Sequence, residues 1–117
     1  MNNKRISRIS EEVKRAISEI IRTELKDPRI SELTSISHVD VTNDLSYAKV
    51  YVTVLGNDED RDKAVEGLNS AKGFIKKELG KKVKLRIMPE LIFINDDSIE
   101  RALEISRLID EVNNEDK

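Results

Sequence analysis

Seven lysine and arginine side chains fall within fifteen residues of this sequence, and phosphate binding is the chemistry that their spacing favours. Within the same stretch only Glu78 opposes them. Lysine is a compact point charge suited to phosphate, and like charges this close repel one another. A solvated helix surface is the simpler interpretation, and charge alone leaves both open. The seven residues are Lys72, Lys76, Lys77, Lys81, Lys82, Lys84 and Arg86.

Groups that could support catalysis or hold a metal are scarce. The 117 residues contain no cysteine and one histidine, His38. Their scarcity excludes a thiol nucleophile and cysteine-ligated zinc, and it leaves no histidine cluster for a metal. Several aspartates are present, but no histidine, cysteine or phosphate-cradling glycine loop converges with them. We therefore expect no catalytic residue, no metal site and no cofactor.

Composition indicates one domain with strongly charged blocks. The 21 basic and 23 acidic residues give a net charge of −2, but residues 72–95 carry seven basic and two acidic groups. Residues 96–117 carry three basic and eight acidic groups. We expect a single domain over residues 1–117, frayed at about residues 1–5 and 113–117. The sequence shows no apolar signal region and no membrane-spanning run, so the cytoplasm is the expected compartment.

The first half of the sequence predicts a helix followed by a β-hairpin. An apolar stripe from Ile6 to Leu25 has helical spacing. Ser7 or Ser10 could cap its start, and Asp27-Pro28 should stop it. Apolar and polar residues alternate over residues 38–41 and 47–55, with turn-forming residues between them. Tyr47 and Tyr51 share the polar side of this hairpin, where they could stack with RNA or serve only as good strand formers.

Two further helices and a strand complete the predicted core. A helix begins at Asn57 or Asp58, and Gly67 and Gly73 predict a kink or a packing site within it. We place the kink at Ala71–Gly73. The basic helix follows, with Phe74, Ile75, Leu79 and Val83 on its predicted buried side. Pro89 ends it, and Leu91–Ile94 predicts a strand in the middle of the sheet that is buried on both faces.

A final amphipathic helix is predicted after that strand. Asp97-Ser98-Ile99-Glu100 has the pattern of a capping box, and apolar residues continue to Val112. The predicted fold class is therefore α+β, a two-layer sandwich. Its element order, α-β-β-α-kink-α-β with an additional C-terminal helix, is that of a type II KH domain. The GXXG loop with which KH domains clamp nucleic acid is absent, and Ala71-Lys72-Gly73 stands in its place.

Four motifs in this order carry a resemblance to a known family. They are Glu24-Leu25-Lys26-Asp27-Pro28-Arg29, Leu45-Ser46-Tyr47-Ala48-Lys49-Val50-Tyr51-Val52, Ala71-Lys72-Gly73-Phe74-Ile75 and Leu85-Arg86-Ile87-Met88-Pro89-Glu90-Leu91. The sequence resembles the ribosome-binding factor A family of bacterial ribosome-assembly proteins over nearly its whole length. The Ala-Lys-Gly triplet in place of GXXG is itself typical of that family.

The resemblance implies a non-enzymatic ribosome-assembly factor. Such a factor binds the immature small (30S) ribosomal subunit and promotes late maturation and 5′-end processing of 16S rRNA, especially in the cold. It implies the small subunit and 16S rRNA as partners, with ribosomal proteins and an assembly GTPase as further candidates, no membrane, and a monomer. The alternative is a protein-interaction or dormancy factor that meets the ribosome through its acidic faces. The expected RNA contacts are Arg5, Arg8, Asn43, Asp44, Lys49, Lys72, Lys76, Lys77, Lys81, Lys82 and Arg86.

Overall fold

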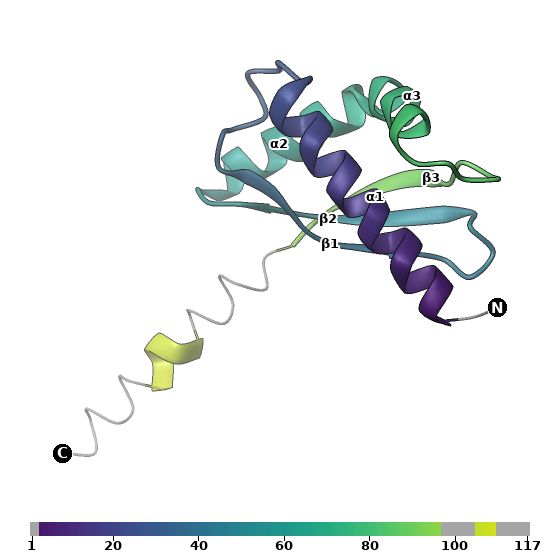
Figure 1. The fold of residues 1–117 in the computed structure, drawn as a ribbon. Coiled ribbons are helices and arrows are strands. Elements are labelled where there is room, and N and C mark those ends of the chain that lie inside the picture. Colours follow the sequence, from purple (N-terminus) through teal and green to yellow (C-terminus); the bar gives the residue numbers. More distant parts are fainter. Residues whose placement is uncertain (1–2, 97–104, 110–117) are drawn as a thin grey trace.

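The computed structural model describes residues 3–96 and 105–109 (Figure 1). Residues 105–109 are helical. The capping box predicted at residues 97–100 and the fraying predicted at residues 113–117 lie outside the described residues. The main elements, in order, are α1 (Asn3–Thr23), β1 (Thr34–Val41), β2 (Tyr47–Val54), α2 (Asp58–Ser70), α3 (Lys72–Lys82) and β3 (Glu90–Asn95).

A three-stranded sheet forms one layer and the helices α1, α2 and α3 form the other (Figure 1). The strand order is β1-β2-β3, with β1 and β2 antiparallel and β2 and β3 parallel. A parallel pair needs a crossover connection, and α2 and α3 supply it. The predicted α+β sandwich with KH-like element order is confirmed.

Alternating and helical apolar patterns correctly predicted most of the core. Every second residue of β2 from Ala48 to Val54 is buried, as are Val39 and Val41 on β1. On α1 the buried stripe runs from Ile9 to Ile20. His38 and Asp40 face outward, as predicted. The helices therefore cover one face of the sheet and leave the other face open.

The prediction for β3 was wrong in two respects. β3 lies at the edge of the sheet, and β2 occupies the middle. Its burial alternates, because Leu91 and Phe93 face the core whereas Ile92 is 37% exposed on the open face. The sheet has helices on one face only, so a strand in it cannot be buried on both.

Both ends of α1 differ from the prediction. The helix begins at Asn3, upstream of both Ser7 and Ser10, so residues 3–5 are helical and neither serine is the cap. The hydroxyl of Ser10 instead accepts a hydrogen bond from the backbone N–H of Val41 (3.1 Å), which joins α1 to β1. The helix ends at Thr23, before the predicted stop at Asp27-Pro28.

The connections around α2 agree with the predicted turn and cap chemistry. The hairpin turn places Leu45 in the left-handed region (φ 61°). Asn57 caps α2 in a capping box with Asp60. α2 ends at Ser70 and α3 begins at Lys72. The helix is therefore interrupted at Ala71, inside the predicted triplet.

The two glycines near this break have different environments. A Cβ atom added at Gly67 would lie 2.9 Å from Cγ1 of Ile30, so this glycine lets the loop before β1 pack against α2. A Cβ added at Gly73 would have no atom within 4 Å. Of the two glycines, Gly67 is therefore the packing site, and Gly73 is not.

One predicted core residue of α3 is on the surface. Ile75 and Leu79 are fully buried, but Phe74 is 43% exposed. Successive helical residues point about 100° apart, so Phe74 cannot share the direction of Ile75. The pair Ile75 and Leu79, one turn apart, occupies the buried side.

Candidate nucleic-acid interface

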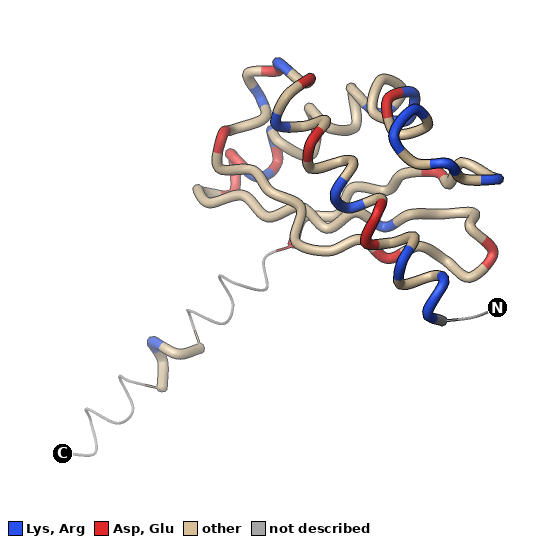
Figure 2. Tube along the Cα trace, in the orientation of Figure 1, with Lys and Arg blue, Asp and Glu red and all other residues tan. Residues whose placement is uncertain are grey.

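The lysines of α3 point in three directions around the helix axis, and the buried residues take up the remaining side. Ile75 and Leu79 fix the side that faces the core. At about 100° per residue, Lys76 is turned towards the sheet, Lys82 towards α1, and Lys77 and Lys81 away from the protein. Figure 2 shows the basic residues gathered along α3 and the loop that follows it.

Lys76 is held by an ion pair with the sheet. Its ammonium group donates a hydrogen bond to Oε2 of Glu90 on β3 at 3.0 Å. The hydrogen bond from Lys76 also lowers the pKa of the Glu90 carboxyl group below its ordinary value. Only 34% of the Lys76 side chain is exposed. This lysine therefore fastens α3 to β3, and a phosphate would have to compete with Glu90 for it.

Lys82 and Lys81 also have acidic partners. The Lys82 ammonium lies 3.4 Å from Glu19 and 3.7 Å from Glu24, and its side chain is 27% exposed. This contact joins the end of α3 to the second half of α1. Lys81 pairs with Glu78 on its own helix at 3.2 Å, but it remains 62% exposed. Lys81 is therefore available to an external anion, whereas Lys82 mainly holds two helices together.

Four cations of this stretch have no ion pair within the described part of the chain. They lie on α3 and on the loop between α3 and β3, and all but the half-buried Lys72 are exposed. The chain leaves helical geometry at Val83 (φ −126°, ψ 125°), so the residues after it form a loop beyond the helix end. We call this set the unpaired cation group; it consists of Lys72, Lys77, Lys84 and Arg86.

Arg5 and Arg8 lie on the first half of α1. Arg8 pairs with Glu12 (3.9 Å), although 79% of its side chain is exposed. Eleven residues separate it from Glu19, which corresponds to about 16 Å along a helix. Acidic residues lie between the two ends of α1, as Figure 2 shows. A continuous basic track from Arg8 to α3 thus remains a prediction.

The three hairpin residues predicted to contact RNA occupy different positions. Asn43 is exposed in the turn. Asp44 has a structural task, because its carboxylate accepts hydrogen bonds from the Ser46 N–H (3.0 Å) and the Thr42 hydroxyl (2.9 Å). The backbone hydrogen bond from Ser46 lowers the pKa of Asp44. Lys49 lies opposite Asp40 on the open face of the sheet, across the sheet from α3.

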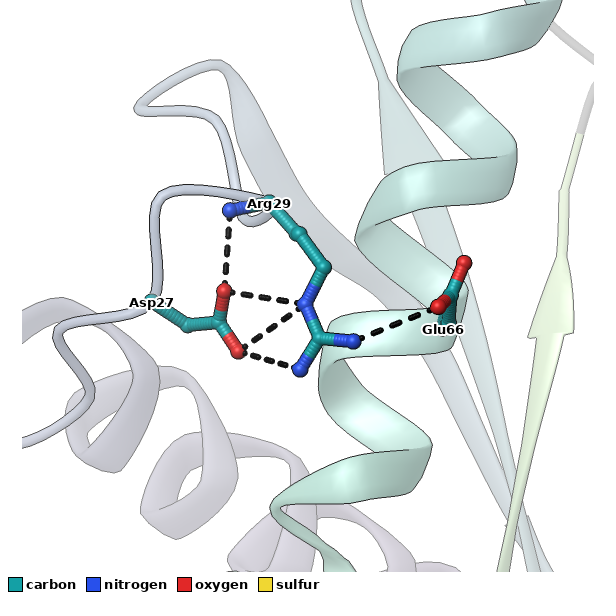
Figure 3. Close-up of polar contacts among 3 residues, drawn as sticks. All are labelled: Asp27, Arg29 and Glu66. Carbon is teal, nitrogen blue, oxygen red and sulfur yellow. Dashed lines mark hydrogen bonds and ion pairs between the residues drawn. The ribbon is translucent and has the colours of Figure 1, made fainter.

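The structure shows a polar cluster around Arg29 for which the sequence predicted no role. Asp27 accepts hydrogen bonds from the Arg29 backbone N–H (2.9 Å) and from its guanidinium (2.8 Å). The guanidinium also lies 3.3 Å from Glu66 of α2 (Figure 3). The side-chain hydrogen bond from Arg29 lowers the pKa of Asp27. This cluster fastens the loop before β1 to α2, beside Gly67.

The described residues hold neither a metal-binding cluster nor a membrane-spanning helix. They contain no cluster of three His, Cys, Asp or Glu side chains that could hold a metal ion. No described helix combines the length and apolarity needed to cross a membrane. The aromatic rings of His38 and Tyr51 lie 5.7 Å apart on the open face of the sheet.

Comparisons with known proteins agree with the fold and with the motifs. The family model for ribosome-binding factor A matches residues 5–109. Ribosome-binding factor A of Acetivibrio thermocellus is 56% identical over 113 residues, which cover 97% of this chain and 92% of that protein. The crystal structure of ribosome-binding factor A from Thermus thermophilus matches with a TM-score of 0.69 and 28% identity, over 77% of this chain and 93% of that one.

A third match concerns a ribosomal complex. Thermus thermophilus ribosome-binding factor A, built by homology and fitted into a cryo-EM map of its 30S complex, matches with a TM-score of 0.65 and 27% identity. The match covers 79% of this chain and 96% of that one. With the matched family model spanning most of the chain, these relationships establish that the chain belongs to the ribosome-binding factor A family.

Proposed function

We propose that this protein binds the immature small ribosomal subunit through the unpaired cation group and Lys81, and that this binding supports late maturation of 16S rRNA. The observation that carries the proposal is the exposure of Lys77 and Lys81 on the outward side of α3 and of Lys84 and Arg86 on the loop that follows it, whereas the half-buried Lys72 lies on the side of Glu90. Similarity to a protein fitted into a map of a 30S complex supports the choice of partner.

The contact we propose is with the RNA backbone. Lysine and arginine bound to phosphates fix the position of a protein without reading base sequence. Structured RNA is then recognised by the spacing of its phosphates, which differs between a folded and a misfolded junction. The ion pairs of Lys76 and Lys82 hold α3 against β3 and α1, so the outward cations are presented on a fixed helix.

We further propose that the protein acts by stoichiometric binding in the cytoplasm, as a monomeric single domain without a catalytic step. By holding one rRNA conformation it would assist 5′-end processing of 16S rRNA. Its effect would be largest in the cold, where misfolded RNA escapes slowly. Removal by an assembly GTPase and contacts with ribosomal proteins are the further partners that this role would involve.

The test measures binding of the purified protein to immature 30S subunits in the presence of competing naked 16S rRNA fragments. Competition by the fragments, together with protection of defined rRNA positions by the bound protein, would support the proposal. The protein-interaction alternative would be favoured by two results together: the fragments do not compete for binding, and replacing exposed acidic residues such as Glu59 abolishes it.

A further inference from the structure

We propose that Phe74 stacks on an unpaired base of the bound RNA, beside the phosphates held by Lys77 and Lys81. This inference rests on the proposed function and adds a contact of a different chemistry to it. An exposed aromatic ring on a cationic helix is the feature that carries it.

The ring of Phe74 is available to a partner. It is 43% exposed, although it lies in the first turn of α3 and precedes the fully buried Ile75. Burying a phenylalanine side chain stabilises a fold, and at 43% exposure this position forgoes part of that gain. Neither core packing nor an aromatic neighbour among the described residues accounts for its place on the surface.

Charge around the ring selects the class of partner. Lys77 and Lys81 follow Phe74 at three and seven residues, so all three lie on the same outward ridge of α3. A peptide helix bound in an apolar groove would need several apolar anchors at such spacings. Here one phenyl ring is followed by two ammonium groups instead. Stacked bases and phosphates satisfy that combination in single-stranded RNA.

Gly73, the neighbour of Phe74 in the sequence, lies in open space. It has no positive φ, and a Cβ added there would meet no atom within 4 Å. Neither backbone conformation nor internal packing therefore requires glycine. Glycine in a helix is also less favourable than alanine. The absence of a side chain there allows an external group to approach the backbone closely.

Stacking does not need the missing GXXG loop. A π-face accepts any base, so an aromatic contact tolerates many sequences and needs no hydrogen bonds to base edges. We therefore predict that Phe74 contacts one unpaired base of the RNA and that any of the four bases can occupy this position.

The test compares Phe74→Leu with Phe74→Trp in binding to purified immature 30S subunits. Leucine keeps an apolar side chain without a π-face, and tryptophan keeps a stacking ring. We expect about a 5- to 100-fold loss of affinity for Phe74→Leu and retained affinity for Phe74→Trp. Because no charge is removed, the salt dependence of Phe74→Leu binding should parallel that of the unaltered protein. Equal melting temperatures of the two variants establish that both remain folded.

A crosslinking experiment locates the base directly. Subunits whose RNA contains 4-thiouridine are irradiated with the bound protein, and the tryptic peptide of residues 73–76 is the expected product. Unchanged binding of Phe74→Leu, or crosslinks only to other peptides, would overturn the stacking inference. Loss of binding in both Phe74 variants would indicate an apolar protein contact and would overturn it as well.

The Lys77→Gln variant separates this inference from the proposed function. If it binds poorly while Phe74→Leu binds normally, the phosphate contact stands and stacking is refuted. If it binds normally with an unchanged salt dependence, the proposed RNA face is itself refuted.

Discussion

The most informative perturbation of the proposed RNA face removes two unpaired cations, Lys77 and Arg86, by substitution with glutamine. Both are exposed, and neither has an acidic partner in the described part of the chain. Their replacement should therefore leave the fold intact. Lys76 is a poorer choice, because Lys76→Glu would place a second carboxylate beside Glu90 and confuse lost binding with lost stability.

The magnitude follows from counterion release. Each phosphate contact contributes about 0.7–0.9 to the slope of log affinity against log salt concentration. Two lost contacts should thus flatten the slope by about 1.4–1.8. Between 50 and 200 mM salt the ratio of unaltered to variant affinity should then fall by about 7- to 12-fold.

Affinity for purified immature 30S subunits, measured at four or more salt concentrations, gives the slope. The matched control is Lys26→Gln with Arg22→Gln, which removes the same charge from exposed positions outside α3 and the loop after it. Parallel lines for the unaltered protein and the Lys77/Arg86 variant would refute phosphate binding by these residues. A control that flattens the slope equally would show that only net charge matters.

Three further substitutions test the structure itself. Gly73→Ala should leave stability unchanged or raise it by about 0.4–1 kcal/mol, because the site is open and the unfolded chain loses freedom; Gly67→Ala should lower it by about 1–3 kcal/mol, because Ile30 occupies the space. Urea unfolding measures both, and equal effects at the two glycines would contradict the assigned packing. The pKa of Asp27 is lowered in the folded state by Arg29, so its contribution to stability is present above the unfolded pKa and is lost as pH falls through the folded one. Asp27→Asn should therefore weaken the dependence of unfolding free energy on pH in the acidic range, and an unchanged dependence between pH 7 and pH 3 would show that this pair contributes nothing.

Sequence periodicity predicted those parts of the fold that depend on neighbours along the chain. The alternation in β2 and the stripe of α1 gave the correct buried faces, because one covered face imposes a period of two on a strand and about 3.6 on a helix. The break at Ala71 was likewise visible in the local composition. The position of β3 at the sheet edge was not, since a run of apolar residues indicates a strand without specifying its neighbours.

Side-chain partners across elements could not be predicted in this way. Lys82 pairs with Glu19, 63 positions away in the sequence, and Lys76 pairs with Glu90, 14 positions away. Such pairs depend on how the helices lie against each other and against β3. The exposure of Phe74 could not be predicted either. It depends on which side of α3 faces the sheet after the helix is interrupted at Ala71.

The basic residues of α3 and the following loop divide into those with a carboxylate partner and those without, and this division affects how the protein would bind RNA. Of the seven basic residues between Lys72 and Arg86, three, namely Lys76, Lys81 and Lys82, have carboxylate partners. Two of those, Lys76 and Lys82, tie α3 to β3 and α1 and are largely covered. A count of positive charges therefore overestimates the phosphates that the helix can neutralise. The buried Ile75 and Leu79 fix which side of α3 faces outward, and the ion pairs of Lys76 and Lys82 add contacts to β3 and α1. The lysines that are lost to phosphate binding thus help to hold the helix that presents the outward ones.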